Sequence, residues 1–390
     1  MARRKPKAKA TMGEAQSMES LISLFEGLED PRVERTRDYS LAEILFLVLS
    51  AVISGVNFLT EVEKFGEAKI EWLRSILPYE NGVPSHDTIG RVLGMLDPDE
   101  LERMFVSWTT AVAEQVDGVV AIDGKAVRRA IARGNKRSFV HMVSAFMSAN
   151  SLVIGQVKVD EKSNEITAIP RLLKLLHLQG AIVTIDAAGC QETIANEIVE
   201  RGGQFVLAVK NNQRTLFEDV DIAFHDVDIR GKQAFASQTE TEELSHGRGE
   251  YRRCEVLHAD EHLTHRDKWP HIKTLVRVTS ERRGVRQELE AHTRLFVSSI
   301  EGLNAAEALR ITRAHWSVEN KLHWILDVAF REDECRVYAA NAAENLVVFR
   351  HIALNLLRSV KSLSGGIASK RNQAAWTDSA REAVLSASLG

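Results

Sequence analysis

The chain has 390 residues, more than one compact core usually holds, so we expect two or three cooperating domains rather than one small module. Its 50 basic and 54 acidic side chains give a formal net charge of −4, so any site for a polyanion must be local. Hydrophobic residues make up 44% and charged residues 27%, which is typical of a folded, soluble protein.

The first part of the chain is expected to be a basic tail followed by a helical domain. Residues 1–17 carry scattered lysines and arginines but lack the apolar core of a signal peptide. Apolar residues at helical spacing predict several helices within residues 18–112, and Ser85 or Asp87 can cap one of them. The most apolar stretch, residues 44–56, is too short to cross a bilayer, so we expect no membrane partner.

From residue 119 the pattern changes to alternating strands and helices. Residues 119–122 are an apolar run that ends on Asp123 and the turn-forming Gly124, which predicts a buried strand. Further strands are predicted at 139–147, 152–159, 181–185 and 205–209, with helices at 166–176 and 194–199. This order predicts a mixed α/β sheet and is that of the ribonuclease H-like fold. By analogy with that fold, Asp123 and Asp186 would end neighbouring strands.

The rest of the chain is expected to complete this domain. Residues 214–300 are polar, with strand-like pieces at 254–257, 272–278 and 293–297, and predict a β-rich insertion. Residues 304–326 and 337–360 have helical spacing. We therefore predict a catalytic α/β domain over residues 113–360 with its insertion at about 214–300, followed by a looser C-terminal tail over 361–390.

A third acid, Glu319, lies in a predicted helix between Trp316 and Trp324, which we expect to pack in the core rather than stack on bases. Packing that helix against the sheet edge would bring Glu319 to the two aspartates. Three clustered anions need a cation, and oxygen ligands select hard divalent ions. Such a site suits two Mg²⁺ or Mn²⁺ ions acting on a phosphodiester. Alternatively, the aspartates only cap turns and Glu319 pairs with Lys321 or His323.

Several polar residues are candidates for DNA contacts. A basic cluster beside Asp123 predicts a track for phosphates, unless it is simply a solvated loop: Lys125, Arg128, Arg129, Arg133, Lys136 and Arg137. Lys210, Asn212 and Gln213 follow a predicted strand and could hold phosphates or bases, although such residues often only form a turn. Two residues flanking Glu319 complete the candidates: His315 and Lys321.

A rival metal site lies in the predicted insertion, where one cysteine and four histidines are close in sequence: Cys254, His258, His262, His265 and His271. The signal for zinc is weak, because no second cysteine is nearby. No GxxxxGK[ST] motif occurs, which argues against coupling to ATP hydrolysis through that loop.

Four blocks of the sequence resemble the insertion-sequence DDE transposases, a family that includes the H-repeat-associated proteins. They are AIDGK at 121–125, KSNEI at 162–166, TIDAAGCQ at 184–191 and HWSVENKLHW at 315–324. Residues 30–32 and 84–88 resemble the N-terminal associated domain of that family, and residues 210–213, 246–250 and 341–357 resemble further blocks. The resemblance spans nearly the whole chain.

The resemblance implies that Asp123, Asp186 and Glu319 are the DDE triad of a ribonuclease H-like domain. The implied reaction is Mg²⁺-dependent cutting of transposon ends and their joining to target DNA by an oligomer in the bacterial cytoplasm, associated with the nucleoid. Three scattered cysteines without a CxxC pair fit a reducing cytosol. The chain departs from relatives in having Ala188 where Met is common, and His315 where some carry Arg. Two alternatives remain: a domesticated or inactive DNA-binding regulator, and a nuclease that cuts without joining.

Overall fold

The computed structural model divides the chain into two compact units, one helical and one built on a sheet. It describes residues 18–113, 118–131, 139–160, 163–231, 234–245, 248–260, 262–283, 290–335, 337 and 341–389. The helical unit comprises residues up to 96 and from 349 onward, and the sheet unit comprises residues 97–348. The predicted basic tail, residues 1–17, lies outside the described residues.

The helical unit is built around a buried helix. Its helices are α1 (Met18–Glu26), α2 (Leu41–Ile53), α3 (Leu59–Ala68), α4 (Ile70–Arg74), α5 (His86–Met95), the second part of α12 (Ala342–Ser359), α13 (Ile367–Trp376) and α14 (Asp378–Leu385). Every residue of α2 is buried, and the side chains of Ser40 and Glu43 form a capping box that starts it. Ser85 caps α5 by accepting from Thr88 N, which settles the choice between Ser85 and Asp87.

The C-terminal segment, which the sequence led us to expect as a looser tail, instead forms α13 and α14. Arg371 is buried, and its guanidinium donates to the carbonyl oxygens of Val52 and Val56 at the end of α2. Glu382 accepts a hydrogen bond from the Trp72 indole at 2.9 Å. Arg371 of α13 thus satisfies carbonyl groups at the C-terminal end of α2, where a helix leaves carbonyls without intrahelical partners, and Glu382 links α14 to the Trp72 indole.

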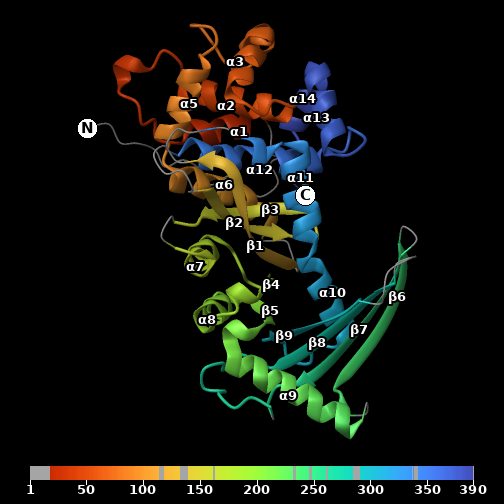
Figure 1. The fold of residues 1–390 in the computed structure, drawn as a ribbon. Helices are drawn as coiled ribbons and strands as arrows, with labels where there is room; N and C mark the ends of the chain where they lie inside the picture. Colours follow the sequence, from red (N-terminus) through yellow and green to blue (C-terminus); the bar gives the residue numbers. More distant parts are fainter. Residues whose placement is uncertain are drawn as a thin grey trace. The chain divides into compact units, whose positions relative to one another are not determined.

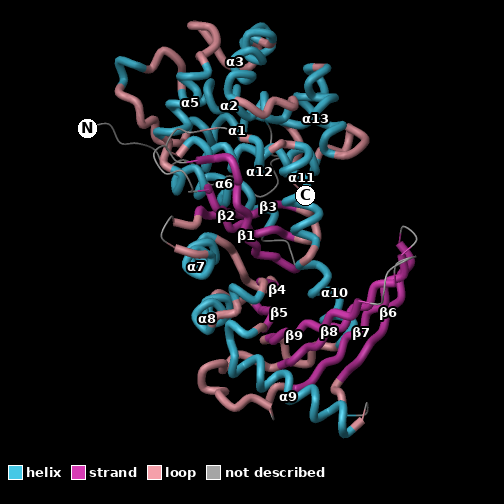
Figure 2. The backbone as a smooth tube through the Cα atoms, viewed as in Figure 1, coloured by secondary structure: helices cyan, strands magenta, loops and turns pink. Residues whose placement is uncertain are grey.

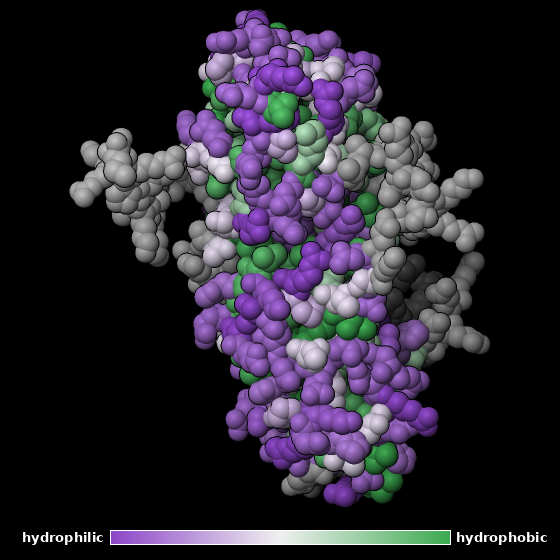
Figure 3. Space-filling view, turned by 90° about the vertical axis from the view of Figure 1, so that its left-hand side faces the viewer, coloured by the Kyte–Doolittle hydropathy of each residue, from purple (hydrophilic) through white to green (hydrophobic). Residues whose placement is uncertain are grey.

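Among the described residues, no helix is both long enough and apolar enough to cross a membrane. The face drawn in Figure 3 is mainly hydrophilic, with small hydrophobic areas between the polar side chains. The apolar segment over residues 44–56 is accounted for by α2, which is buried within the helical unit.

The sheet unit contains a mixed nine-stranded sheet in the order β3-β2-β1-β4-β5-β9-β8-β7-β6 (Figure 1). Its strands are β1 (Val119–Ile131), β2 (Phe139–Met147), β3 (Leu152–Lys158), β4 (Ile182–Ile185), β5 (Gln204–Val209), β6 (Ser237–Ser245), β7 (Arg248–His258), β8 (Thr274–Arg283) and β9 (Glu290–Ser298). β4 pairs in parallel with β1 and β5, whereas the other ladders are antiparallel. The predicted mixed α/β sheet is therefore present.

The strands within the predicted β-rich insertion extend the same sheet. β9 pairs with β5, so β9, β8, β7 and β6 continue the sheet outward from that strand (Figure 2). The sequence analysis missed α9 (Arg214–Arg230), which packs on this extension. Arg277 of β8 joins the two, with its guanidinium 4.8 Å from the Phe224 ring centroid and paired with Asp228.

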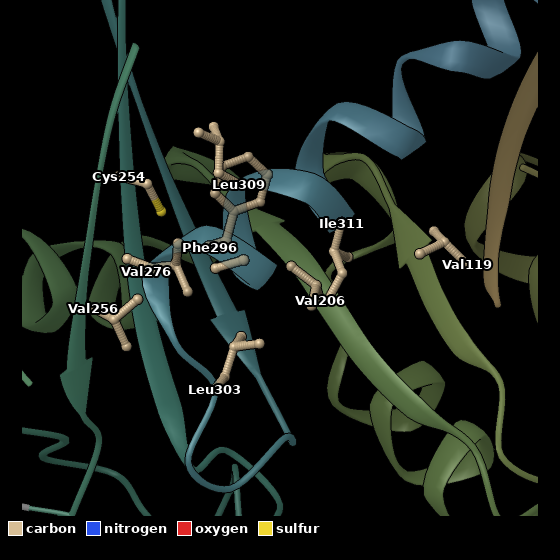
Figure 4. Close-up of a cluster of buried hydrophobic side chains, with 11 residues drawn as sticks. Val119, Val206, Cys254, Val256, Val276, Phe296, Leu303, Leu309 and Ile311 are labelled. Carbon is tan, nitrogen blue, oxygen red and sulfur yellow. The ribbon is translucent and has the colours of Figure 1, made fainter. Parts of the chain in front are cut away.

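Helices cover both faces of the sheet (Figure 1). They are α6 (Pro98–Ala113), α7 (Glu165–Leu175), α8 (Glu192–Glu200), α10 (Ala305–His315) and α11 (Trp324–Ala329). Leu309 and Ile311 of α10 pack against strand residues such as Val206, Val276 and Phe296 (Figure 4). This cluster joins α10 to both the central strands and the extension, and it fixes where the segment after α10 begins.

The buried carboxyl group of Glu102 in α6 is expected to make the stability of the sheet unit depend on pH. Burial raises its pKa to about 8, although it accepts a hydrogen bond from Gln156 N at 2.7 Å. The folded protein therefore keeps a proton that the unfolded chain releases above its ordinary pKa of 4.5, so stability falls as pH rises from 4.5 to 8. Glu102→Gln should remove this loss, which is at most about 1.4 kcal/mol per pH unit. Denaturant melts at pH 5 and 8 test it, and equal pH dependence in both proteins would contradict it.

Candidate active site

Asp123 and Asp186 lie next to each other on neighbouring parallel strands. Ile122 of β1 pairs with Ile185 of β4, so the two aspartates occupy the next position on each chain. The prediction that the first strand ends at Asp123 is wrong, because β1 continues to Ile131. The reason is that β1 stays paired with β2 after its ladder with β4 has stopped.

Asp186 is held by the backbone that follows β4. It caps the short 3₁₀ helix η2 (Ala187–Gly189), with Oδ1 accepting from Ala188 N at 3.0 Å and Gly189 N at 3.4 Å. Asn212 donates to Ala187 O at 2.6 Å, and Gln213 donates to Gln191 Oε1 at 3.0 Å. Both candidates for DNA contact thus support the segment that positions Asp186.

Glu319 begins a π-helical turn, η5 (Glu319–His323), between α10 and α11, and its side chain is exposed. The pKa of Asp123 is raised to about 7, mainly by burial and in addition by the charges of Asp186, Glu165 and Glu319, although the hydrogen bond from Gly124 N to Asp123 Oδ1 opposes the shift. The structure therefore brings Asp186 and Glu319 within electrostatic reach of Asp123.

The donor chemistry of the three acids fits a hard divalent ion, because all supply carboxylate oxygens and their mutual repulsion would be relieved by a cation. However, no three His, Cys, Asp or Glu side chains within the described ranges are already arranged as ligands of one ion. Cys254 and the four histidines after it are all described, and they are not arranged as ligands of one ion either. The structure therefore does not support the alternative zinc site.

His323 lies against Asp123, with Nδ1 3.6 Å from Asp123 Oδ2. Burial, with Lys125 nearby, lowers the pKa of His323 to about 4, so the ring is neutral at pH 7. Its Nε2 is buried and has no hydrogen-bond partner in the described part of the chain. In the sequence analysis His323 appeared only as an alternative partner of Glu319.

Two candidates for DNA contact are engaged inside the protein. Lys125 Nζ pairs with Asp327 and Glu332, each at 2.6 Å, and only 11% of its side chain is exposed. Burial lowers the pKa of Lys125, but Glu332 and Asp327 more than offset this and raise it overall. His315 is buried, and its Nδ1 lies 3.1 Å from Thr184 Oγ1. Neither side chain is presented to DNA in this arrangement.

The remaining basic candidates are exposed or undescribed. Lys210 follows β5 and Lys321 lies in η5, and both side chains are exposed. The side chains of Arg128 and Arg129, at the end of β1, lie outside the described residues, as do three further predicted members of the basic cluster: Arg133, Lys136 and Arg137.

The expectation that Trp316 and Trp324 belong to the core is wrong, because their side chains are 37% and 60% exposed. The buried positions of this helical segment are instead Val318, Leu322 and Leu326, which recur every four residues and therefore define its inner side. Arg294 of β9 lies over Trp316, with its guanidinium carbon 4.3 Å from the ring centroid.

The structure contains a groove of about 570 Å³ beside Glu319, which the sequence analysis did not predict. Its walls are β7, β8 and β9 on one side and the α10–η5 segment on the other. Polar and aromatic residues dominate the lining: Glu250, Arg252, Ser280, His292, Arg294, Thr312, Arg313, Trp316, Glu319 and Asn320. Two of its arginines already have acidic partners, because Arg313 and Arg252 both pair with Glu243.

Comparison with known proteins gives matches along most of the chain. Residues 22–109 match the DDE_Tnp_1-associated domain, and residues 114–356 match the transposase DDE domain. The chain is 38% identical to the "Putative transposase YncI" of Escherichia coli O157:H7 over 376 residues, which is 95% of each protein. It is also 38% identical to the "H repeat-associated putative transposase YhhI" of Escherichia coli K12, over 95% of this chain and 99% of that protein. A short match, 44% identical over 55 residues, is to the "Inactive transposase YbfQ".

Proposed function

The chain belongs to the DDE transposase family, and from this premise we propose that it cuts DNA at the ends of an insertion sequence and joins them to target DNA. The observation that carries the proposal is the parallel pairing of β1 with β4, which sets Asp123 beside Asp186, together with Glu319 close enough to raise the pKa of Asp123. In this proposal the three carboxylates act as one catalytic unit.

We also propose that the catalytic domain is ribonuclease H-like, with β6–β9 as its insertion. The order β3-β2-β1-β4-β5, with α7 and α8 leading into β4 and β5, supports this assignment. The sequence analysis based the expectation on the order of these strands and helices along the chain. The fold is relevant to function because it sets the carboxyl ends of β4 and β5 at one edge of the sheet, beside the acid in β1.

Asp123, Asp186 and Glu319 would hold the two divalent ions, Mg²⁺ or Mn²⁺. When bound, such ions act as Lewis acids that favour attack on phosphorus and stabilise the leaving oxygen. The chain's own residues prepare this site: backbone N–H groups orient Asp186, and His323 keeps a neutral ring against Asp123. The side chain of Glu319 is exposed and borders the groove between the sheet and the α10–η5 segment.

The reaction proposed consists of two in-line displacements. Water first attacks the phosphodiester at the element end, the bond from phosphorus to the 3′-oxygen breaks, and a 3′-hydroxyl is released. That hydroxyl then attacks a target phosphodiester and displaces the target's own 3′-oxygen, so each step breaks one P–O bond and forms one: the first is a hydrolysis, and the second exchanges one phosphoester for another. Because two ends must be joined to one target, we propose that the protein acts as an oligomer on DNA in the bacterial cytoplasm.

Exposed basic and aromatic residues near Glu319 support a path for the DNA backbone. We expect Arg294→Ala to weaken DNA binding and to lower the slope of log affinity against log salt by about one, as for the loss of one phosphate contact. Arg310→Ala is the matched control, because Arg310 is an exposed arginine of α10 outside the groove lining. Binding titrations at several salt concentrations measure the slope, and an unchanged slope for Arg294→Ala would remove it from the DNA path.

The proposed function is tested by mapping products on defined DNA. The protein is incubated with Mg²⁺ or Mn²⁺, labelled DNA carrying the element's own ends, and a target plasmid, beside Glu319→Gln. We expect cleavage at the ends and joining to the plasmid, both absent in the variant. Cleavage without joining would favour a nuclease, and binding without metal-dependent cleavage would favour a domesticated DNA-binding protein.

A further inference from the structure

Glu165, in the KSNEI block at residues 162–166, lies near the proposed site. Glu165 is the first residue of α7, and its side chain is 26% exposed. Its Oε1 lies 2.9 Å from Nε2 of His141, which is on β2 and pairs across the ladder with Ala126 of β1. The start of α7 is therefore tied to the strands next to Asp123.

Gly124 shows how closely Glu165 approaches β1. A Cβ atom on Gly124 would lie 2.0 Å from Glu165 Oε1 and 2.5 Å from its Cδ, closer than side-chain atoms can pack. Gly124 is not among the described glycines with positive φ, so its backbone conformation does not require glycine. A side chain at position 124 would therefore displace the Glu165 carboxylate, which lies directly on the backbone of the residue after Asp123.

The charge of Glu165 acts on the same groups as the predicted triad. Its carboxylate lies against Gly124, the residue that follows Asp123 and donates its N–H to Asp123 Oδ1. With those of Asp186 and Glu319, the carboxylate of Glu165 is therefore a third negative group that acts at Asp123, so the site contains four acids rather than three.

We propose that Glu165, clamped by His141 and accommodated by Gly124, is a positioning residue that places a fourth carboxylate beside Asp123 and raises the affinity of the site for divalent cations. This inference rests on the proposed function, because it concerns the cation site of that function. Glu165 acts through the field it adds at Asp123 and through the fixed position of α7. Because the triad offers only oxygen donors, it selects hard divalent cations, and the negative charge of Glu165 would attract the same cations.

The test measures Mn²⁺ binding directly, in the full-length protein without DNA, by the loss of the electron paramagnetic resonance signal of free Mn²⁺. We expect Glu165→Gln, which keeps the shape of the side chain, to weaken Mn²⁺ binding by about tenfold, as is usual for residues that support a metal site. Cleavage should return at saturating Mn²⁺. Glu307→Gln is the matched control, because Glu307 lies in the first turn of α10 and pairs with Arg310.

A second pair of variants distinguishes the proposed effect on Mn²⁺ binding from a general folding defect. Gly124→Ala should weaken Mn²⁺ binding in the wild-type background, because its methyl group displaces Glu165. In a Glu165→Ala background the same change should have a much smaller further effect, because the carboxylate at 2.0 Å is gone and only His141 Nε2, at 3.0 Å, remains close to the new methyl group. Additive losses in the double variant would contradict the contact on which the inference rests.

The remaining outcomes separate the inference from the proposed function. Wild-type Mn²⁺ affinity in Glu165→Gln would overturn the inference and leave the triad untouched. Loss of cleavage at saturating Mn²⁺ with normal affinity would also overturn it, because Glu165 would then act in the chemistry. If Asp123→Asn binds Mn²⁺ as tightly as the wild type does, the proposed cation site itself is wrong.

Discussion

Asp123→Asn is expected to abolish metal-dependent cleavage of element ends while leaving DNA binding largely intact, and Asp186→Asn and Glu319→Gln should behave alike. Each amide keeps the size of the side chain but removes a negative charge from the cluster. Because the three carboxylates are proposed to act as one unit, the loss of any one should lower the cleavage rate by about a thousandfold or more. Single-turnover cleavage at saturating Mg²⁺ measures it.

Asp160→Asn supplies the matched control for these variants. Asp160 lies in the sheet unit shortly after β3, and its side chain is 73% exposed and paired only loosely with Arg171, at 3.4 Å. It should cleave at the wild-type rate. If one of the three triad variants also cleaves within a few-fold of the wild type, that residue does not belong to the site.

Lys125→Met should cause the largest loss of stability among single changes near the site. Lys125 compensates Glu332, which is 1% exposed, and also pairs with Asp327. Removing one partner of a buried ion pair is strongly destabilising, and Glu332 and Asp327 would each lose a cation at 2.6 Å, so we expect the free energy of unfolding to fall by about 3 to 5 kcal/mol. Cleavage should fall as well. These ion pairs connect β1 to the segment that follows η5, and η5 itself carries Glu319. Denaturant titration measures the stability.

A double variant separates the lost charge partner from lost packing. Lys125→Met combined with Glu332→Met removes both ends of the pair and should recover most of the stability, because apolar residues of similar volume often replace a buried pair without loss. Arg171→Met is the exposed control, since Arg171 is 45% exposed, and it should change stability by less than about 1 kcal/mol. A double variant as unstable as Lys125→Met alone would contradict this explanation.

The two aspartates of the site could be predicted from the sequence, because each follows an apolar run that forms a strand. Asp186 directly follows an apolar run, and parallel pairing of β1 with β4 then sets it beside Asp123. The extent of β1 was not predictable, because its second half is a strand only through pairing with β2. Gly124, taken as a turn residue, is instead a strand residue that leaves room for Glu165.

The roles of charged and aromatic residues were the least predictable part. Lys125 looked like a phosphate ligand because its sequence neighbours are basic, whereas its acidic partner Glu332 is 207 positions away. Trp316 and Trp324 have apolar neighbours in sequence, but the inner side of their segment is taken by residues at a spacing of four. A sequence shows which residues carry charge or apolar surface, and only the fold shows what they face.

Anomalous diffraction from crystals of the protein soaked in Mn²⁺ tests most directly whether Asp123, Asp186 and Glu319 form one cation site. We predict a Mn²⁺ peak bound by carboxylate oxygens of Asp123 and Asp186, with Glu319 turned toward it, and a weaker peak in Glu165→Gln at the same Mn²⁺ concentration. The absence of a peak at these residues, or a peak bound elsewhere, in a protein whose cleavage requires Mn²⁺ would contradict the account.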